Sequence, residues 1–178
     1  MAMIIRCATM ADIPALEKLI PAAVRGLSQE YYTSEQIEAA LSEIFGVDTQ
    51  LISDGTYFLA EVTGEVVGCG GWSKRQTLFG SDVRKAGASD ALLDPAKDAA
   101  RIRAFYVHPN WARRGVGKQI LRVCEDAAKS AGFTRLELVA TRPGQPLYAA
   151  MGYTAIEATV LPMSDGKSLP ACRMRKQL

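Results

Sequence analysis

The stretch that decides the fold is residues 105–117, which read Phe105-Tyr106-Val107-His108-Pro109-Asn110-Trp111-Ala112-Arg113-Arg114-Gly115-Val116-Gly117. Its first residues are typical of a strand, and the residues after its two glycines have the apolar spacing of an amphipathic helix. The first turn of a helix leaves backbone N–H groups unpaired and carries the positive end of the helix dipole. Glycines that let an anion approach those groups make a phosphate site, and Arg113, Arg114 and Lys118 would add charge-assisted contacts.

Two common phosphate-binding motifs do not match this run. A P-loop needs a glycine four intervening residues before its Gly-Lys pair, but position 112 is alanine and position 119 is glutamine. A dinucleotide-binding fingerprint needs a third glycine where Ile120 stands. The run therefore indicates a phosphate ligand that is bound in neither of these two ways.

The rest of the chain predicts strands and helices on both sides of this unit. The expected strands are residues 4–7, 56–62, 66–72, 101–107, 133–140, 153–161 and 169–174. The expected helices follow the N-cap residues Thr9 and Thr33, follow Gly117, and occupy residues 146–151. Residues 73–100 are the longest irregular stretch, which indicates a binding loop or a partly disordered segment. This order predicts an α+β fold with a mixed, mostly antiparallel central sheet of about six or seven strands and helices on both faces.

Length and composition exclude several classes of protein. A chain of 178 residues predicts one domain that spans residues 1–178. Its formal net charge of +2 predicts no nucleic-acid partner, and no apolar run approaches the roughly 20 residues that span a membrane. The four cysteines form no CxxC pair and His108 is the single histidine, so we expect no metal site. The N-terminus lacks the pattern of a signal peptide, and we therefore expect a cytoplasmic protein.

Three segments together resemble one enzyme family. Residues 105–117 resemble the signature of the GCN5-related N-acetyltransferases (GNAT), in which a strand and His-Pro precede a Q/R-x-x-G-x-G/A loop and a helix. The second segment, Pro146-Leu147-Tyr148-Ala149-Ala150-Met151-Gly152-Tyr153, resembles the short helix of that family. Residues 5–12 resemble its start, so the similarity runs in order over nearly the whole chain. The resemblance implies the acyl-CoA N-acyltransferase fold.

The resemblance also implies an activity and its residues. An N-acetyltransferase of this kind transfers the acetyl group of acetyl-CoA, its co-substrate, to a primary amine of a small molecule or peptide by direct attack. Tyr148 matches the tyrosine that protonates the departing thiolate. Residues 113–118 would hold the pyrophosphate and residues 105–107 would pair with the pantetheine, so the cofactor-binding residues are Phe105, Tyr106, Val107, Arg113, Arg114, Gly115, Val116, Gly117 and Lys118. Dimerisation is common in the family, which makes a homodimer one possible assembly.

Two positions depart from the family pattern. Ala112 occupies the Q/R position of the loop, and Arg101 stands where many relatives place a glutamate that relays the proton of the substrate amine. The general base is therefore open between Glu61, Asp98, Tyr31, Tyr32, a bound water, and an amine that arrives neutral. The missing glutamate leaves an alternative, a catalytically silent acyl-CoA-binding sensor or interaction module.

Several other residues have two interpretations. Arg101 and Arg103 alternate along a predicted strand, where they form either a solvated face or a site for a substrate carboxylate. Cys69 lies in a glycine-rich run that suits close packing or the approach of a ligand. Tyr31 and Tyr32 could wall the acceptor pocket. His108 is read as a turn residue.

Overall fold

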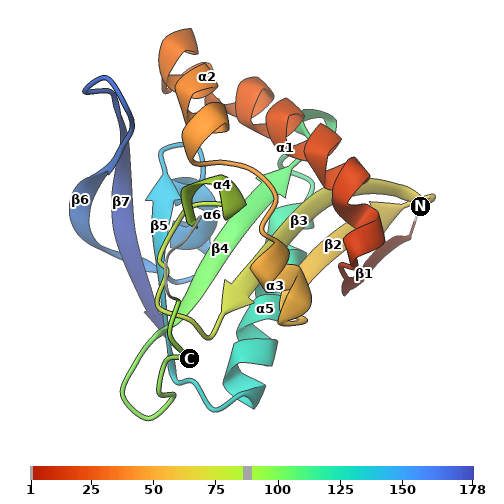
Figure 1. Cartoon of the computed structure of the whole chain (residues 1–178). Coiled ribbons are helices and arrows are strands. Elements are labelled where there is room, and N and C mark those ends of the chain that lie inside the picture. The colour runs from red at the N-terminus through yellow and green to blue at the C-terminus, as the bar shows by residue number, and fades with distance from the viewer. Residues whose placement is uncertain (1, 86–89) are drawn as a thin grey trace.

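The computed structural model describes residues 2–85 and 90–178. Within these residues seven strands form one sheet in the order β1-β2-β3-β4-β5-β7-β6, in which only β4 and β5 are parallel neighbours (Figure 1). The strands are β1 (Met3–Cys7), β2 (Tyr57–Val62), β3 (Glu65–Ser73), β4 (Ala100–Val107), β5 (Arg135–Thr141), β6 (Thr154–Pro162) and β7 (Ser168–Gln177). The predicted fold class is thus confirmed.

Helices cover both faces of the sheet. The helices are α1 (Ile13–Ser28), α2 (Ser34–Glu43), α3 (Thr49–Ser53), α4 (Asp82–Lys85), α5 (Val116–Ser130) and α6 (Gln145–Ala150), with single turns η1 (Met10–Asp12) and η2 (Pro109–Trp111). Helices α5 and α6 pack on one face, where Ile120, Leu121 and Tyr148 join the core. Helices α1, α2 and α3 pack on the other face through residues such as Leu16 and Ile37. Burial of both faces explains why β2 and β3 are largely apolar rather than alternating.

Local signals account for several helix ends. Thr9 and Asp12 form the expected capping box at η1, from which α1 continues. Thr33 accepts a hydrogen bond from the Gln36 amide and begins α2 as predicted. Helix α5 ends beside Gly132, whose φ of +94° suits a residue without a side chain.

The structure also contains elements that were not predicted. Helix α3 fills the interval between the second predicted helix and residue 56, and the Asp48 carboxylate accepts a hydrogen bond from the Leu51 amide at its start. Strand β7 runs to Gln177, three residues beyond the predicted end, because its residues 171–177 pair with β5. The stretch expected to be irregular contains α4 and an isolated bridge between Arg75 and Leu92, while residues 86–89 of that stretch lie outside the described residues.

Candidate active site

The site begins where β4 and β5 separate. The two strands pair only at Ala100 with Leu136 and at Arg101 with Glu137, although both continue for several residues beyond this point. Figure 1 shows the two arrows diverging toward their carboxyl ends. The remainder of the β4 edge, which includes the predicted pantetheine-pairing residues, therefore does not pair with β5. A diverging parallel pair of this kind can accept an extended ligand that pairs with the strand backbone.

A bulge interrupts β4 within this unpaired part. Gly70 of β3 lies opposite two β4 residues, Ala104 and Phe105, where regular pairing would place one. Ala104 has a φ of +58°, a conformation that residues with a side chain seldom adopt. Gly70 makes room for the bulge, since a Cβ atom there would lie 2.6 Å from the Phe105 ring. The glycine-rich run of β3 thus serves close packing against β4.

The start of α5 lies at the end of the loop that follows β4. Gly115 caps the helix with a φ of +86°, and the intrahelical hydrogen bonds begin with the Gln119 amide donating to Gly115 O at 3.1 Å. The preceding amides of the first turn therefore point out of the helix without an acceptor in it. Arg113, Arg114 and Lys118 are exposed, and none forms an ion pair with a carboxylate in the part of the chain that the structure describes. The predicted phosphate site is thus a cationic helix start next to the diverging strands.

Helix α6 brings Tyr148 to the bulge. The Tyr148 ring packs edge-on against Phe105, with ring centroids 6.1 Å apart, and against Tyr153 at 5.7 Å. Gly117 lets α6 approach α5, because a Cβ atom there would lie 3.0 Å from the Leu147 side chain. Burial raises the pKa of Tyr148 above its ordinary value, so the phenol keeps its proton at neutral pH. The predicted general acid, Tyr148, is therefore in direct contact with β4, the strand that is predicted to bind the cofactor.

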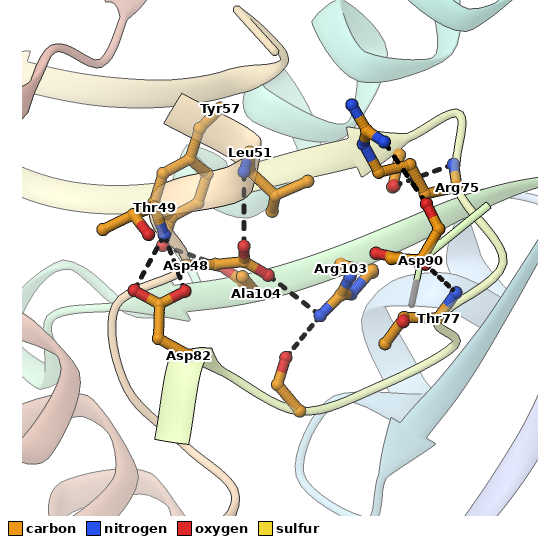
Figure 2. Close-up of polar contacts among 12 residues, drawn as sticks. Asp48, Thr49, Leu51, Tyr57, Arg75, Thr77, Asp82, Asp90, Arg103 and Ala104 are labelled. Carbon is orange, nitrogen blue, oxygen red and sulfur yellow. Dashed lines mark hydrogen bonds and ion pairs between the residues drawn. The ribbon is translucent and has the colours of Figure 1, made fainter. Parts of the chain in front are cut away.

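The two arginines of β4 are engaged by carboxylates. Arg103 is buried and forms a 2.9 Å ion pair with the fully buried Asp48, and it also donates to Gly80 O (Figure 2). The interpretation of Arg103 as part of a solvated face is therefore wrong. Its buried partner, Asp48, lies directly before α3, and the residue pattern of the strand alone could not indicate that contact. Arg101 lies 3.5 Å from Glu137 of β5, and Arg173 of β7 also binds that carboxylate.

The candidate bases lie in different places. Glu61 is bound by Arg6 at 2.9 Å on β2, and Asp98 accepts a hydrogen bond from the Asp94 amide in the loop before β4. Tyr32 is buried, donates to Pro170 O at 2.6 Å and accepts from the Arg142 amide at 2.8 Å. These three groups have structural partners, and the structure does not bring them to the bulge as a set.

Two further predictions concern single residues. His108 accepts a hydrogen bond from the Asn110 amide and caps η2, which confirms it as a turn residue. Cys69 is fully buried beside the bulge. Asp48 and Tyr57, which lie near Ala104 (Figure 2), were missed. The sequence Asp48-Thr49-Gln50 before the apolar Leu51 and Ile52 was a usable N-cap signal for α3.

The described residues contain neither a metal-binding cluster nor a membrane-spanning helix. No group of three or more histidine, cysteine, aspartate or glutamate side chains among residues 2–85 and 90–178 is arranged to hold a metal ion. Within the same ranges, none of the helices has the length and apolar character needed to cross a membrane.

Comparisons with known proteins agree with the geometry. The family model described as "Acetyltransferase (GNAT) family" matches residues 21–153. A solved GCN5-related N-acetyltransferase from Rhodopseudomonas palustris, described as "Aminotransferase, Class-II", is 22% identical and gives a TM-score of 0.73 over 100% of this chain and 99% of its own. The PaiA N-acetyltransferase from Thermoplasma acidophilum, solved in complex with coenzyme A, is 15% identical, with a TM-score of 0.68 over 100% of both chains.

A third solved structure has a similar fold. The ribosomal-protein-alanine N-acetyltransferase from Brucella melitensis is 20% identical and gives a TM-score of 0.65 over 98% of this chain and 99% of its own. A search of curated proteins gave no match. At such identities the three solved structures show a shared fold.

Proposed function

This chain belongs to the GNAT acetyltransferase family, and on that premise we propose that it acetylates the primary amine of a small molecule or peptide by direct attack on acetyl-CoA. Acetyl-CoA is the acetyl donor that the family uses, and the chain is an acyl-CoA-dependent N-acyltransferase. The observation that carries the proposal is the divergence of β4 and β5 beside the cationic start of α5. One end of this arrangement suits phosphates, and the other suits a peptide-like arm.

Backbone amides and basic side chains would hold the donor. The pyrophosphate would accept hydrogen bonds from the amides of residues 115–118, with Arg113, Arg114 and Lys118 adding charge. The pantetheine would then extend along the unpaired edge of β4 at residues 105–107. Arg114 already stacks on Trp111 with its guanidinium 5.3 Å from the ring centroid, which keeps its side chain close to the helix start.

The bulge and Tyr148 supply the chemistry. A main-chain N–H of the bulged strand would donate to the thioester oxygen, where negative charge develops as the amine attacks. The C–N bond forms, the C–S bond breaks, and the Tyr148 hydroxyl would give its proton to the leaving sulfur. The proton that the attacking nitrogen loses on becoming an amide passes to solvent, and solvent returns a proton to the Tyr148 phenolate. The reference pKa values of a phenol and a thiol differ by only about 1.5 units, and the burial that raises the pKa of Tyr148 would also raise the pKa of a thiol beside it, so this proton transfer is feasible.

The acceptor amine is proposed to lose its proton before it attacks. Arg101 occupies the family's glutamate position, and a guanidinium cannot accept a proton. Amines with a low pKa are then favoured: an α-amino group near 8 over a lysine side chain near 10.4. A neighbour named for the alanine of a ribosomal protein supports including peptides among the candidate acceptors.

The test combines binding with turnover. Isothermal titration with acetyl-CoA measures the binding of the donor, and release of free thiol with a panel of amino acids, polyamines, aminoglycosides and peptides measures transfer. Binding together with acetylation of at least one amine supports the proposal. Binding without transfer to any amine contradicts it in favour of an acyl-CoA sensor, and absence of binding contradicts both.

Further proposals concern the context of the enzyme. We place residues 1–178 in one acetyltransferase domain and the enzyme in the cytoplasm, since all four cysteines are free thiols. A homodimer stays a proposal that analytical ultracentrifugation would test.

A further inference from the structure

The carbonyl group of the bulge residue is held from the side of the sheet away from β5. The Tyr57 hydroxyl lies 3.3 Å from Ala104 O and 3.2 Å from Cys69 Sγ, and Cys69 Sγ lies 3.8 Å from the same carbonyl oxygen. Tyr57 comes from β2 and Cys69 from β3, so both contacts draw the carbonyl toward those strands. Figure 2 shows Tyr57 and Ala104 next to the Asp48–Arg103 pair.

Both side chains remain proton donors. Burial raises the pKa of Tyr57 well above its ordinary value and raises the pKa of the Cys69 thiol to about 12. The phenol donates either to the carbonyl directly or to the sulfur, and in the second arrangement the thiol can donate to the carbonyl. Each arrangement gives Ala104 O a donor, which offsets the cost of a partly buried backbone oxygen outside the regular ladder.

The position of this carbonyl determines the direction of the next amide. The peptide bond between Ala104 and Phe105 is trans and planar, because none of the described bonds is cis, so its C=O and N–H groups point in opposite directions. A carbonyl drawn toward β2 and β3 directs the Phe105 N–H toward the side where β5 diverges. That side is where the thioester would lie in the proposed function.

We propose that Tyr57, assisted by Cys69, is a positioning residue that aims the Phe105 N–H at the thioester carbonyl by holding the Ala104 carbonyl. The proposal rests on the proposed acetyltransferase function and deepens it. Tyr57 itself does not touch the donor; it acts through the peptide plane of the bulge. The Asp48–Arg103 pair secures the residue before the bulge and the loop at Gly80, which keeps the neighbouring backbone in place.

The test reads the thioester bond directly and needs no knowledge of the acceptor. Infrared difference spectra of acetyl-CoA labelled with ¹³C at its carbonyl report the hydrogen bond to that carbonyl, as a lower stretching frequency in the complex than in water. We expect Tyr57→Phe to lose at least half of this shift while the Kd for acetyl-CoA changes less than about twofold. With an amine that the wild type acetylates, kcat falls about tenfold, which is the scale of a misaimed donor.

A neighbouring substitution controls for the loss of a buried hydroxyl. Thr56→Val removes a hydroxyl that donates to Leu51 O at 3.4 Å, at a residue adjacent to Tyr57 that is 5% exposed. It should lower the melting temperature as Tyr57→Phe does, yet leave the carbonyl frequency and kcat unchanged. If Tyr57→Phe fails to fold, Cys69→Ala removes the weaker contact and should give a smaller change in the same direction.

The results of these measurements test the role of Tyr57 separately from the proposed acetyltransferase function. A wild-type frequency shift that Tyr57→Phe or Cys69→Ala diminishes, but Thr56→Val preserves, supports the positioning role. A shift that stays equal in all variants overturns the role of Tyr57 and leaves the acetyltransferase proposal intact. A wild type that does not bind acetyl-CoA overturns the proposed function, and this inference with it.

Discussion

Replacing Asp48 with asparagine removes one charge from the most deeply buried ion pair of the described residues. Asp48 is 0% exposed and the Arg103 side chain is 2% exposed, with 2.9 Å between their nearest atoms (Figure 2). An asparagine has nearly the same shape, and its oxygen can still accept the Leu51 amide that Asp48 accepts at 3.2 Å. The substitution therefore keeps the shape of the side chain, removes its charge and replaces the oxygen that faces Arg103 by an NH2 group that cannot accept a hydrogen bond.

The expected loss of stability follows from the burial. Removing one partner of a buried pair leaves the other charge without compensation and costs about 3–5 kcal/mol. For a chain of this length, about 1 kcal/mol lowers the melting temperature by roughly 2–4 °C. Asp48→Asn should thus unfold roughly 6–20 °C below the wild type.

Thermal and urea unfolding, followed by circular dichroism, measure this loss. Asp48→Asn combined with Arg103→Met should recover most of it, because no unpaired charge then remains in the interior. Glu38→Gln is the control: it breaks the exposed pair of Glu38 with Arg25, and we expect no measurable change. A melting temperature of Asp48→Asn within about 2 °C of the wild type would refute the reasoning, and so would a double variant that is less stable than the single one.

The remaining predictions concern catalysis, donor binding and pH. Tyr148→Phe should lower kcat about 10- to 100-fold while the affinity for acetyl-CoA stays nearly intact. Unchanged turnover in the thiol-release assay would contradict the role of Tyr148 as the general acid. Arg114→Ala should weaken acetyl-CoA binding several-fold at low salt and less in 1 M salt, where charges are screened beyond about 3 Å; titrations showing equal losses at both salts would argue against a phosphate contact. Arg6 holds the pKa of Asp12 at about 2, below its unfolded value of about 3.9, so the pair stabilises the protein by about 1 kcal/mol above pH 4 and loses this as the pH falls toward 2. The difference in unfolding free energy between wild type and Asp12→Asn should shrink over that interval, and a constant difference contradicts the assignment. Finally, kcat/KM should rise with pH up to the pKa of the acceptor amine itself; one shared inflection for amines of different pKa would reveal a base on the protein.

Elements with a local signal could be predicted from the sequence. The capping boxes at Thr9 and Thr33 and the glycine after α5 act through neighbouring residues, so the sequence around them carries the information. The loop of residues 113–118 is similar, because its charges and its glycines all lie within six consecutive residues. Helix α3 has only five residues and is stabilised by distant partners such as Asp82, which binds the Thr49 amide.

The contacts that hold the backbone of the candidate site in place could not be predicted in this way. Arg103 was assigned from its alternation along β4, but its partner Asp48 lies 55 positions away in the chain and meets it only in the folded protein. The sequence around Tyr57 is that of an ordinary strand. Its contact with Ala104 depends on a bulge in β4 that no residue type predicts. A residue that acts by holding the backbone of another strand leaves no pattern in the sequence around it.

The pairing of β5 has a consequence for the biosynthesis of the enzyme. One arm of the proposed donor site, β5, is attached to β4 at only two positions and is held mainly by β7. Strand β7 follows the other described elements along the chain, so in a nascent polypeptide that lacks residues 168–177 the main partner of β5 is missing. The placement of β5 beside β4 therefore depends on the element of the described chain that is synthesised last.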